Sequence, residues 1–196
     1  WNNYNTDKYG VYDEGTSGTT YNEAGFWVFN TKFPEGLKNP SNFAHSISSR
    51  FGVWLGPRGG YVTPGQFGKV IEDGGNGYYN AQAGDIDVGS HKYINNLDKF
   101  LSNWIREYKI NYFKLDGFAS AACTNSTHDH MVGGPNDAYY FTDLWERYIH
   151  VFEHFREVAE ESEIPNFWIS ITCFVNPSPF HLQWANSVWF QISGDV

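Results

Sequence analysis

Apolar residues recur at three- and four-residue steps in two long stretches of the chain, and this spacing predicts two amphipathic helices. The first runs from His91 to Tyr108 and the second from about Ala138 to Glu161. Short apolar runs before, between and after these stretches predict buried strands. The expected strands cover residues 51–55, 112–115, 167–173 and 187–192, and a short helix is expected at 179–185. This alternation indicates parallel strands joined by crossover helices.

An α/β barrel and a doubly wound sheet both fit this order of elements. No glycine-rich phosphate-binding loop follows any expected strand, so a nucleotide-binding open sheet is disfavoured. Two long segments, residues 56–90 and 117–137, each follow an expected strand. In a barrel such segments lie on the C-terminal face, where active sites are built, and long loops in compact domains are usually functional.

Charge and length narrow the function classes. The net charge is -9, the sequence pI is about 5.1 and no Lys/Arg cluster occurs, so the electrostatic footprint of a nucleic-acid-binding protein is missing. We find no apolar run long enough to span a bilayer and no signal peptide. The 196 residues are fewer than the roughly 250 of a complete eight-stranded barrel.

Aromatic residues make up 19% of the chain, with Trp 8, Tyr 13 and Phe 16. They fit either an aromatic core or a cleft in which flat rings stack against sugars. The two cysteines, Cys123 and Cys173, are too few for a disulfide framework. Whether they pair with each other stays open, and neither has the sequence spacing of a zinc site.

Two aspartates end expected strands. Asp116 follows residues 112–115, and Asp195 follows the last apolar run. Two carboxylates facing a sugar are the usual device for glycoside hydrolysis. Lys114 lies two residues before Asp116, so both side chains are expected on the same face of the strand. The pair fits a nucleophile kept ionised by a cation, or a structural ion pair.

Four segments, in this order, resemble the α-galactosidase (melibiase) group of retaining glycoside hydrolases, clan D, closest to family thirty-six. The first ends in a Phe-Pro-x-Gly-Leu phrase that leads into a helix, the second is like the third barrel strand, and the third carries a Lys-x-Asp nucleophile motif. The fourth places a cysteine at the end of the fifth strand and an aspartate after the sixth. These segments are residues 25–37, 51–57, 112–116 and 173–195.

The resemblance implies a (β/α)8 TIM barrel, of which residues 1–196 form a partial catalytic domain covering about strands three to six. Trp1 would be the tryptophan of the family's Asp-Asp-Gly-Trp phrase at the end of strand two. Strands one, two, seven and eight would then lie outside this chain. Because its strand edges would be unpaired, we expect this piece alone to be inactive.

The resemblance also implies a reaction. Asp116 would attack the anomeric carbon and form a covalent glycosyl-enzyme intermediate, with Asp195 as acid and base. The substrate would carry a terminal α-linked galactose. The segment 173–180 differs from the family's glycine-rich fifth loop, which reads the C2 substituent, so N-acetylgalactosamine is a second expected sugar. The residues expected to bind substrate are Trp1, Trp54, Arg58, Lys114, Cys173 and Asn176.

Other interpretations stay open. The barrel fits an α-glucosidase-like enzyme, or a non-catalytic carbohydrate-binding protein. Residues 127–130, Thr-His-Asp-His, contain metal-ligand types but are interpreted as a polar loop, and Asp85 and Asp87 as turn residues. We therefore predict no metal and no cofactor. The expected partner is an oligosaccharide or glycoconjugate substrate, with no nucleic acid, and the oligomeric state is undetermined.

Overall fold

The computed structural model describes residues 29, 33–57, 77–119, 121–172 and 178–189. Its α-helices are α2 (Lys38–Ser46), α4 (His91–Tyr108) and α5 (Ala138–Glu161). Its strands are β1 (Gly52–Leu55), β2 (Tyr79–Asn80), β3 (Asp85–Ile86), β4 (Tyr112–Asp116), β5 (Trp168–Thr172) and β6 (Ser187–Trp189). Two short 3-10 helices complete it, η2 (Pro135–Asp137) and η3 (Pro179–Gln183). Both predicted long helices are confirmed.

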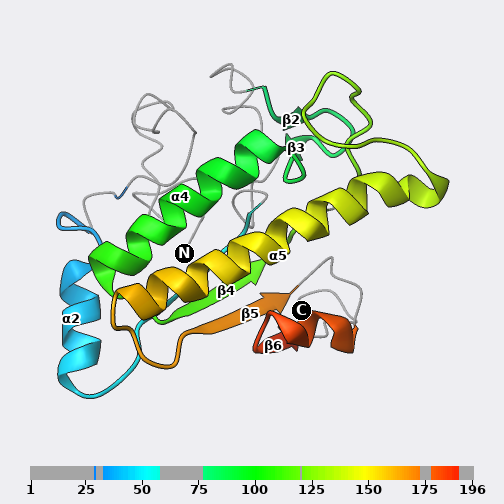
Figure 1. Cartoon of the computed structure of the whole chain (residues 1–196). Coiled ribbons are helices and arrows are strands. Elements are labelled where there is room, and N and C mark those ends of the chain that lie inside the picture. Colours follow the sequence, from blue (N-terminus) through cyan, green and yellow to red (C-terminus); the bar gives the residue numbers. More distant parts are fainter. Residues whose placement is uncertain (1–28, 30–32, 58–76, 120, 173–177, 190–196) are drawn as a thin grey trace, which may run out of the picture.

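Four strands form one sheet in the order β1-β4-β5-β6, and every neighbouring pair is parallel. The helices α4 and α5 connect successive strands and lie side by side over one face of this sheet (Figure 1). The predicted α/β architecture with a parallel sheet is therefore confirmed. The last expected strand begins at Ser187 as predicted, and its residues 190–192 lie outside the described part of the chain.

The helix-facing side of the sheet is apolar. Phe113 of β4 is fully buried and packs against Phe155 of α5, with ring centroids 5.4 Å apart, and against Phe167. Truncating such a phenylalanine typically costs about 3–5 kcal/mol. The strands β1, β4 and β5 add further buried side chains to this layer: Leu55, Leu115, Ile169 and Ile171. The alternation along each strand leaves the opposite face for polar and aromatic residues.

The N-terminus of α4 is capped from a distant loop as well as locally. The Ser90 hydroxyl accepts a hydrogen bond from the Tyr93 amide. The carboxylate of Asp129 accepts bonds from the Ser90 hydroxyl at 2.7 Å and from the amides of His91 and Lys92. Asp129 therefore satisfies backbone donors that the helix leaves open, and the charge suits this end of the helix dipole. This contact ties the segment after β4 to α4.

Two asparagines each stand immediately before a strand, and their side chains accept a hydrogen bond from the start of the neighbouring strand. The side-chain oxygen of Asn111 accepts the amide of Phe51 at 2.9 Å. Asn186 repeats this contact on the Ile169 amide, also at 2.9 Å. Their backbones join the same neighbours, so the N-terminal edge of the sheet is closed by paired backbone and side-chain bonds.

A small hairpin that the sequence pattern did not predict lies in the long segment before α4. The strands β2 and β3 pair antiparallel with two residues each. Asn80 closes the turn by accepting the amides of Gln82 and Ala83. Its side chain also donates to the Ala121 carbonyl, which joins the hairpin to the segment after β4. The two long loops predicted to be functional therefore lie in contact.

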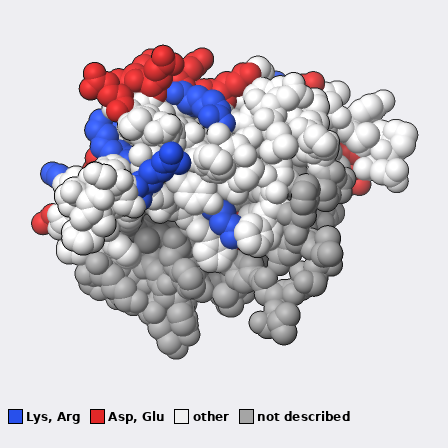
Figure 2. Space-filling view, turned by 90° about the horizontal axis from the view of Figure 1, so that it is seen from below, with Lys and Arg blue, Asp and Glu red and all other residues white. Residues whose placement is uncertain are grey.

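The described surface is mainly acidic on one side. Figure 2 shows acidic side chains gathered along one edge of the molecule. The exposed glutamates of α5 are Glu146, Glu153, Glu157, Glu160 and Glu161. They form the polar side of the amphipathic helix whose other side packs on the sheet. None of the helices in the described ranges is long and apolar enough to cross a bilayer.

Candidate functional site

The face of the sheet away from α4 and α5 carries polar and aromatic side chains in register. Trp54 of β1 pairs with Lys114 of β4, which in turn pairs with Ser170 of β5. One pair further along, Asp116 lies opposite Thr172, and Thr172 opposite Trp189 of β6. Because paired residues of parallel strands share a face, these side chains form one surface at the C-terminal ends of the strands.

Asp116 is the last residue of β4 and is only 9% exposed. Its Oδ2 accepts a hydrogen bond of 2.8 Å from the indole Nε1 of Trp54. Among the described residues no partner contacts its Oδ1. The following Gly117 has φ 73, a conformation that favours glycine, and its amide donates to the Thr172 carbonyl. The chain thus turns away sharply and leaves one carboxylate oxygen open.

Lys114 shares the face of Asp116, as predicted from their spacing. Its ammonium lies 5.2 Å from the centroid of the Trp54 ring and 5.3 Å from that of Trp189. Contacts of this kind stabilise a cation without neutralising it. Within the described ranges no ion pair joins Lys114 to Asp116, so the structural ion pair considered from the sequence is not formed. We call Trp54, Lys114, Asp116 and Trp189 the strand-end site.

A glycine makes room on this face. A Cβ atom at Gly52 would lie 2.4 Å from the ring of Tyr112, with which it pairs across β1 and β4. The tyrosine ring therefore lies over the glycine, two residues before Lys114 on the same face. Any larger residue at position 52 would displace this tyrosine ring.

Five of the predicted site residues lie outside the described part of the chain: Trp1, Arg58, Cys173, Asn176 and Asp195. Their roles stay predictions. Of the remaining three, Trp54, Lys114 and Asp116, all lie together on the strand-end site. Trp189 was not predicted as a site residue. Its position in the last expected strand could have indicated it, because alternate residues of a strand share a face. Its side chain is 61% exposed.

Asp87 is a turn residue as predicted, since its carbonyl accepts the Ser90 amide at 3.1 Å and its Oδ1 accepts the Gly89 amide at 3.3 Å. Its side chain is also fully buried, in contact with a segment some forty residues away, which the sequence did not indicate. Its Oδ2 lies 2.6 Å from Nδ1 of His128 and 2.8 Å from Nε2 of His130. The thiol of Cys123 lies 3.4 Å from the same His128 nitrogen. We call Asp87, Cys123, His128 and His130 the loop cluster. The interpretation of Asp85 as a turn residue was wrong, because Asp85 lies in β3, where it is buried.

Burial and charge act in opposite directions in the loop cluster. Burial alone raises the pKa of Asp87, but hydrogen bonds and charge from His130, with bonds from His128 and Tyr140, bring that pKa below its ordinary value. Burial likewise opposes the charged form of His130, yet the Asp87 carboxylate raises its pKa. Burial, the main cause, and the Asp87 charge raise the pKa of the Cys123 thiol to about 11. Cys123 carries a free thiol.

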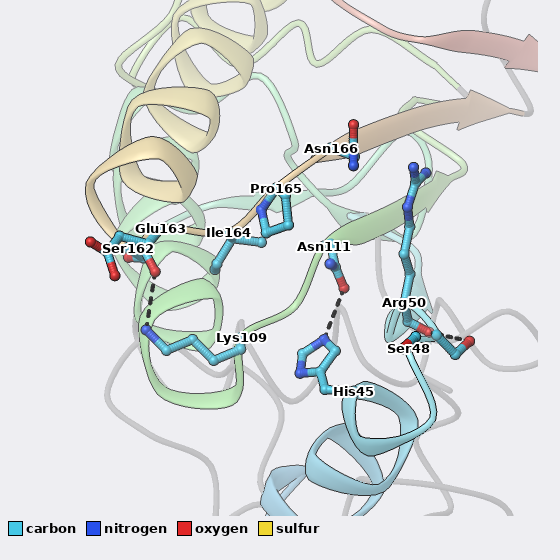
Figure 3. Close-up of a pocket in the computed structure, with 11 residues that line it drawn as sticks. His45, Ser48, Arg50, Lys109, Asn111, Ser162, Glu163, Ile164, Pro165 and Asn166 are labelled. Atoms are coloured by element: carbon cyan, nitrogen blue, oxygen red, sulfur yellow. Dashed lines mark hydrogen bonds between the residues drawn. The ribbon is translucent and has the colours of Figure 1, made fainter.

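A cavity of about 640 Å³ opens at the other end of the sheet (Figure 3). It is lined by the segments that precede β1, β4 and β5, including Arg50, Lys109, Asn111 and Glu163. These are N-terminal strand ends, and Asp116 ends its strand on the opposite side. In barrels the N-terminal face serves stability and the C-terminal face chemistry. The strand-end site is therefore the candidate functional site.

No protein-family model and no curated protein matches the sequence. The fold is similar to that of solved α-galactosidases of glycoside hydrolase family 36. A variant of AgaA from Geobacillus stearothermophilus, crystallised with stachyose, matches at 14% identity and TM-score 0.57, over 95% of this chain and 26% of that chain. The α-galactosidase from Lactobacillus brevis matches at 18% identity and TM-score 0.53, over 95% of this chain and 25% of that chain.

At these identities the likeness concerns the fold. The chain spans about a quarter of the length of the enzymes it matches. The matched parts belong to glycoside hydrolase catalytic barrels, which agrees with the parallel sheet and helical layer described above. The predicted fold class is confirmed, and the likeness to α-galactosidases is a likeness of fold.

Proposed function

We propose that this chain forms part of the catalytic barrel of a retaining glycoside hydrolase of the α-galactosidase type, with Asp116 as its nucleophile. In this proposal β1, β4, β5 and β6 correspond to strands three to six of the barrel. One observation carries it: a nearly buried carboxylate ends a central parallel strand, with one oxygen held by an indole and the other open. The distant likeness to family 36 enzymes supports the reaction class.

The geometry of Asp116 suits nucleophilic attack. The bond from Trp54 orients the carboxylate and stabilises its negative charge, as charge-assisted hydrogen bonds do. With Oδ2 engaged, Oδ1 is the oxygen that would bond to the anomeric carbon as the glycosidic bond breaks. The leaving oxygen takes a proton from a second carboxylic acid, and the same group later removes a proton from the water that releases the sugar.

Lys114 and the two tryptophans fit a sugar-binding role. The ammonium lies between two indole rings rather than on a carboxylate, so its N–H groups remain available to sugar hydroxyls. The exposed ring of Trp189 offers a flat apolar surface at the rim. Such a surface suits the C–H face of a pyranose, while the lysine fixes the orientation of its hydroxyls.

The second carboxylate of the proposal is Asp195, which retaining chemistry requires at about 5–5.5 Å from the nucleophile. We propose that Trp1, Arg58, Cys173 and Asn176 complete the pocket around it. The sugar in the pocket would be a terminal α-linked galactose or N-acetylgalactosamine of an oligosaccharide or glycoconjugate.

Trapping of the covalent intermediate tests the proposal directly. The full-length protein would be incubated with a fluorinated α-galactosyl fluoride, which forms the glycosyl ester rapidly and releases it slowly. Mass spectrometry of peptides should then place the sugar on Asp116. An Asp98→Asn variant is a matched control, because Asp98 is a helix carboxylate paired with His154 away from the strand-end site. Label on another residue would contradict the assignment of Asp116.

Chromogenic α-galactoside, α-N-acetylgalactosaminide and α-glucoside substrates separate the remaining alternatives. Turnover of the glucoside alone would replace the galactosidase assignment by an α-glucosidase-like one. Binding of sugars without turnover or labelling would indicate a carbohydrate-binding protein instead. We expect turnover of one of the first two substrates, with retention of configuration in the released sugar.

A further inference from the structure

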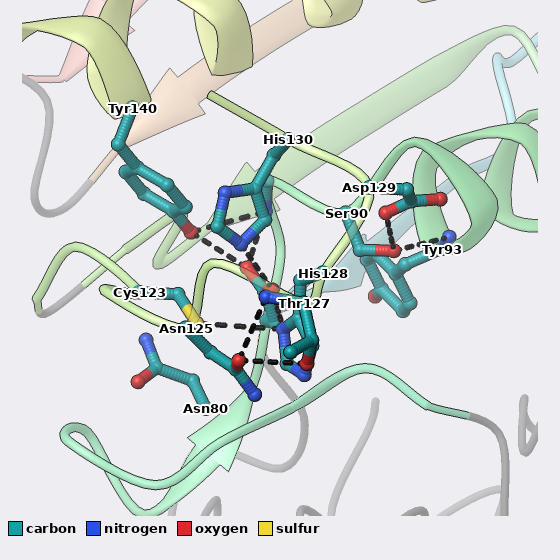
Figure 4. Close-up of polar contacts among 12 residues, drawn as sticks. Asn80, Ser90, Tyr93, Cys123, Asn125, Thr127, His128, Asp129, His130 and Tyr140 are labelled. Atoms are coloured by element: carbon teal, nitrogen blue, oxygen red, sulfur yellow. Dashed lines mark hydrogen bonds and ion pairs between the residues drawn. The ribbon is translucent and has the colours of Figure 1, made fainter. Parts of the chain in front are cut away.

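The loop cluster brings four potential metal-binding side chains to one point (Figure 4). One ligand atom from each of Asp87, Cys123, His128 and His130 lies within 4.8 Å of every other. The side chains of Asp87 and His130 are fully buried and that of His128 is 11% exposed. One carboxylate, one thiol and two imidazoles are the types of ligand that bind zinc in proteins.

The orientation of His130 leaves one of its nitrogens without an ordinary partner. Nδ1 lies 2.9 Å from the Met131 carbonyl, so it carries a proton and donates it there. A neutral ring would then present the lone pair of Nε2 to the cluster. Nε2 is buried and, among the described residues, has no hydrogen-bond partner of acceptable geometry, although Asp87 Oδ2 lies only 2.8 Å away. Two acceptors this close need either a proton or a metal cation between them.

The distances are close to those of a tetrahedral zinc site. With zinc–nitrogen and zinc–oxygen bonds of about 2.0–2.1 Å and a zinc–sulfur bond of about 2.3 Å, ligand atoms stand roughly 3.3–3.6 Å apart. The Cys123 Sγ to His128 Nδ1 distance of 3.4 Å falls in this range. The two nitrogen–oxygen distances, 2.6 and 2.8 Å, need to open by at least about 0.7 and 0.5 Å when the ion enters.

The surroundings orient the ligands as in known metal sites. The Tyr140 hydroxyl donates to Asp87 Oδ1 at 3.0 Å, which leaves Oδ2 to face the histidines. The Gly89 amide donates to the Tyr140 oxygen at 3.1 Å and so fixes the tyrosine. His130 is held by its backbone contact and packs edge-on against the Tyr140 ring. Outer contacts of this kind fix ligand orientation and raise metal affinity.

We propose that Asp87, Cys123, His128 and His130 bind one zinc ion, which holds the loop before α4 against the loop before α5. Four protein ligands and near-complete burial leave no open position for water, so the site is structural rather than catalytic. The Cys123 thiol binds as the thiolate and releases its proton to solvent when zinc enters. This site is independent of the proposed glycosidase activity, since none of its ligands belongs to the strand-end site.

The competing arrangement is a network held by protons alone. It requires His130 to be an imidazolium, with one proton on Nδ1 for Met131 and another on Nε2 for Asp87. The geometry at Nε2 is poor for that second bond. In that network the Cys123 thiol makes only a weak sulfur hydrogen bond, at 3.4 Å from the same His128 nitrogen. Zinc accounts for both features with one ion.

Metal analysis of the full-length protein tests the proposal. Protein produced in zinc-containing medium and purified without a metal column should carry one equivalent of zinc by mass spectrometry. Replacement of zinc by cobalt should give the ligand-field bands of a tetrahedral site and a thiolate-to-cobalt charge-transfer band. Cys123→Ser should remove the charge-transfer band and weaken zinc binding by at least about 100-fold. His130→Ala should do the same to zinc binding.

The control is His154→Ala, because His154 also contacts an aspartate, at 2.7 Å from Asp98, but within the described ranges it belongs to no group of three or more metal-ligand side chains. It should retain the full zinc content and the cobalt spectrum. Circular dichroism separates loss of metal from loss of fold in each variant, and the wild-type cobalt spectrum does not depend on any variant. The proposal is overturned if the wild-type protein binds neither zinc nor cobalt, or if Cys123→Ser leaves the cobalt spectrum unchanged.

Discussion

The strand-end site and the loop cluster lie beyond the C-terminal ends of the same parallel strands, yet they are built in opposite ways. In the strand-end site each side chain projects from a strand, and Asp116 keeps one oxygen open beside the exposed Trp189. In the loop cluster the ligands come from two loops and face inward on one another. An open, rigidly mounted carboxylate is suited to chemistry, whereas a closed set of ligands is suited to holding loops in place.

The comparison implies that the two sites respond separately to substitution. Changes in the strand-end site should alter turnover and leave metal content and thermal stability nearly unchanged. Changes in the loop cluster should alter metal content and stability first, and turnover only through the position of the loops.

The largest expected effect is on turnover in Asp116→Asn. The substitution keeps the shape and the indole contact but removes the charge of the proposed nucleophile, so kcat should fall by about 10⁴-fold or more. Chromogenic assays on the full-length protein measure it, and zinc content should stay at the wild-type level. Azide, a small external nucleophile, should restore part of the turnover in Asp116→Gly. Activity within tenfold of wild type in Asp116→Asn would separate this residue from the chemistry.

Removal of zinc should have the second largest effect. A ligand present at a thousandfold excess over its Kd stabilises the folded state by about 4 kcal/mol. For a domain of this size chelation should therefore lower Tm by roughly 10 °C. Differential scanning calorimetry with and without a strong chelator measures the shift, with His154→Ala as the matched control protein. An unchanged Tm would mean that protons alone hold the loops.

Trp54→Phe tests the hydrogen bond that orients Asp116 in the strand-end site. Phenylalanine keeps the ring beside Lys114 but removes the N–H that holds Asp116 Oδ2. A hydrogen bond to a charged group contributes about 1.5–3 kcal/mol, so kcat should fall about 10- to 100-fold. The change should appear in kcat more than in KM, because the orientation of the nucleophile is lost while the sugar-facing ring remains. A change in KM alone would assign Trp54 to binding.

The smallest effect is expected for Tyr140→Phe. The variant loses the hydroxyl that donates to Asp87 Oδ1 but keeps the ring packed against His130. Zinc affinity should fall about tenfold, as for other outer contacts to metal ligands. Competition with a colorimetric chelator measures it, and turnover should be close to wild type. Equal affinities in the two proteins would show that Asp87 needs no orienting partner.

The elements with a strong repeating pattern could be predicted from the sequence. Both α4 and α5 begin and end at the residues expected, since long runs of apolar residues at helical spacing define one buried face. The shared face of Lys114 and Asp116 followed from the two-residue period of a strand. The contacts of the Lys114 ammonium with two tryptophan rings could not be predicted in this way. They depend on how β1 and β6 are aligned with β4 in the sheet.

The loop cluster could not be predicted for a different reason. Residues 127–130 contain metal-ligand types, but Asp87 and His128 are 41 positions apart in the chain and nothing in the sequence indicates that the two segments meet. The hairpin of β2 and β3 is too short to give a pattern. Asp129 shows the same limit, since the residue between the two histidines caps α4 instead of joining them. Long-range loop packing decides all of these contacts.

The asparagines at the N-terminal edge fix the strand register on which the opposite end of the sheet depends. Asn111 and Asn186 fix where one strand begins relative to the next. A slip of one residue would turn every side chain of a strand to the other face. Lys114 and Asp116 would then point into the apolar helical layer, and Phe113 would take their place in the strand-end site. The alignment of the strand-end site is thus set at the opposite end of the sheet, by residues that belong to neither site.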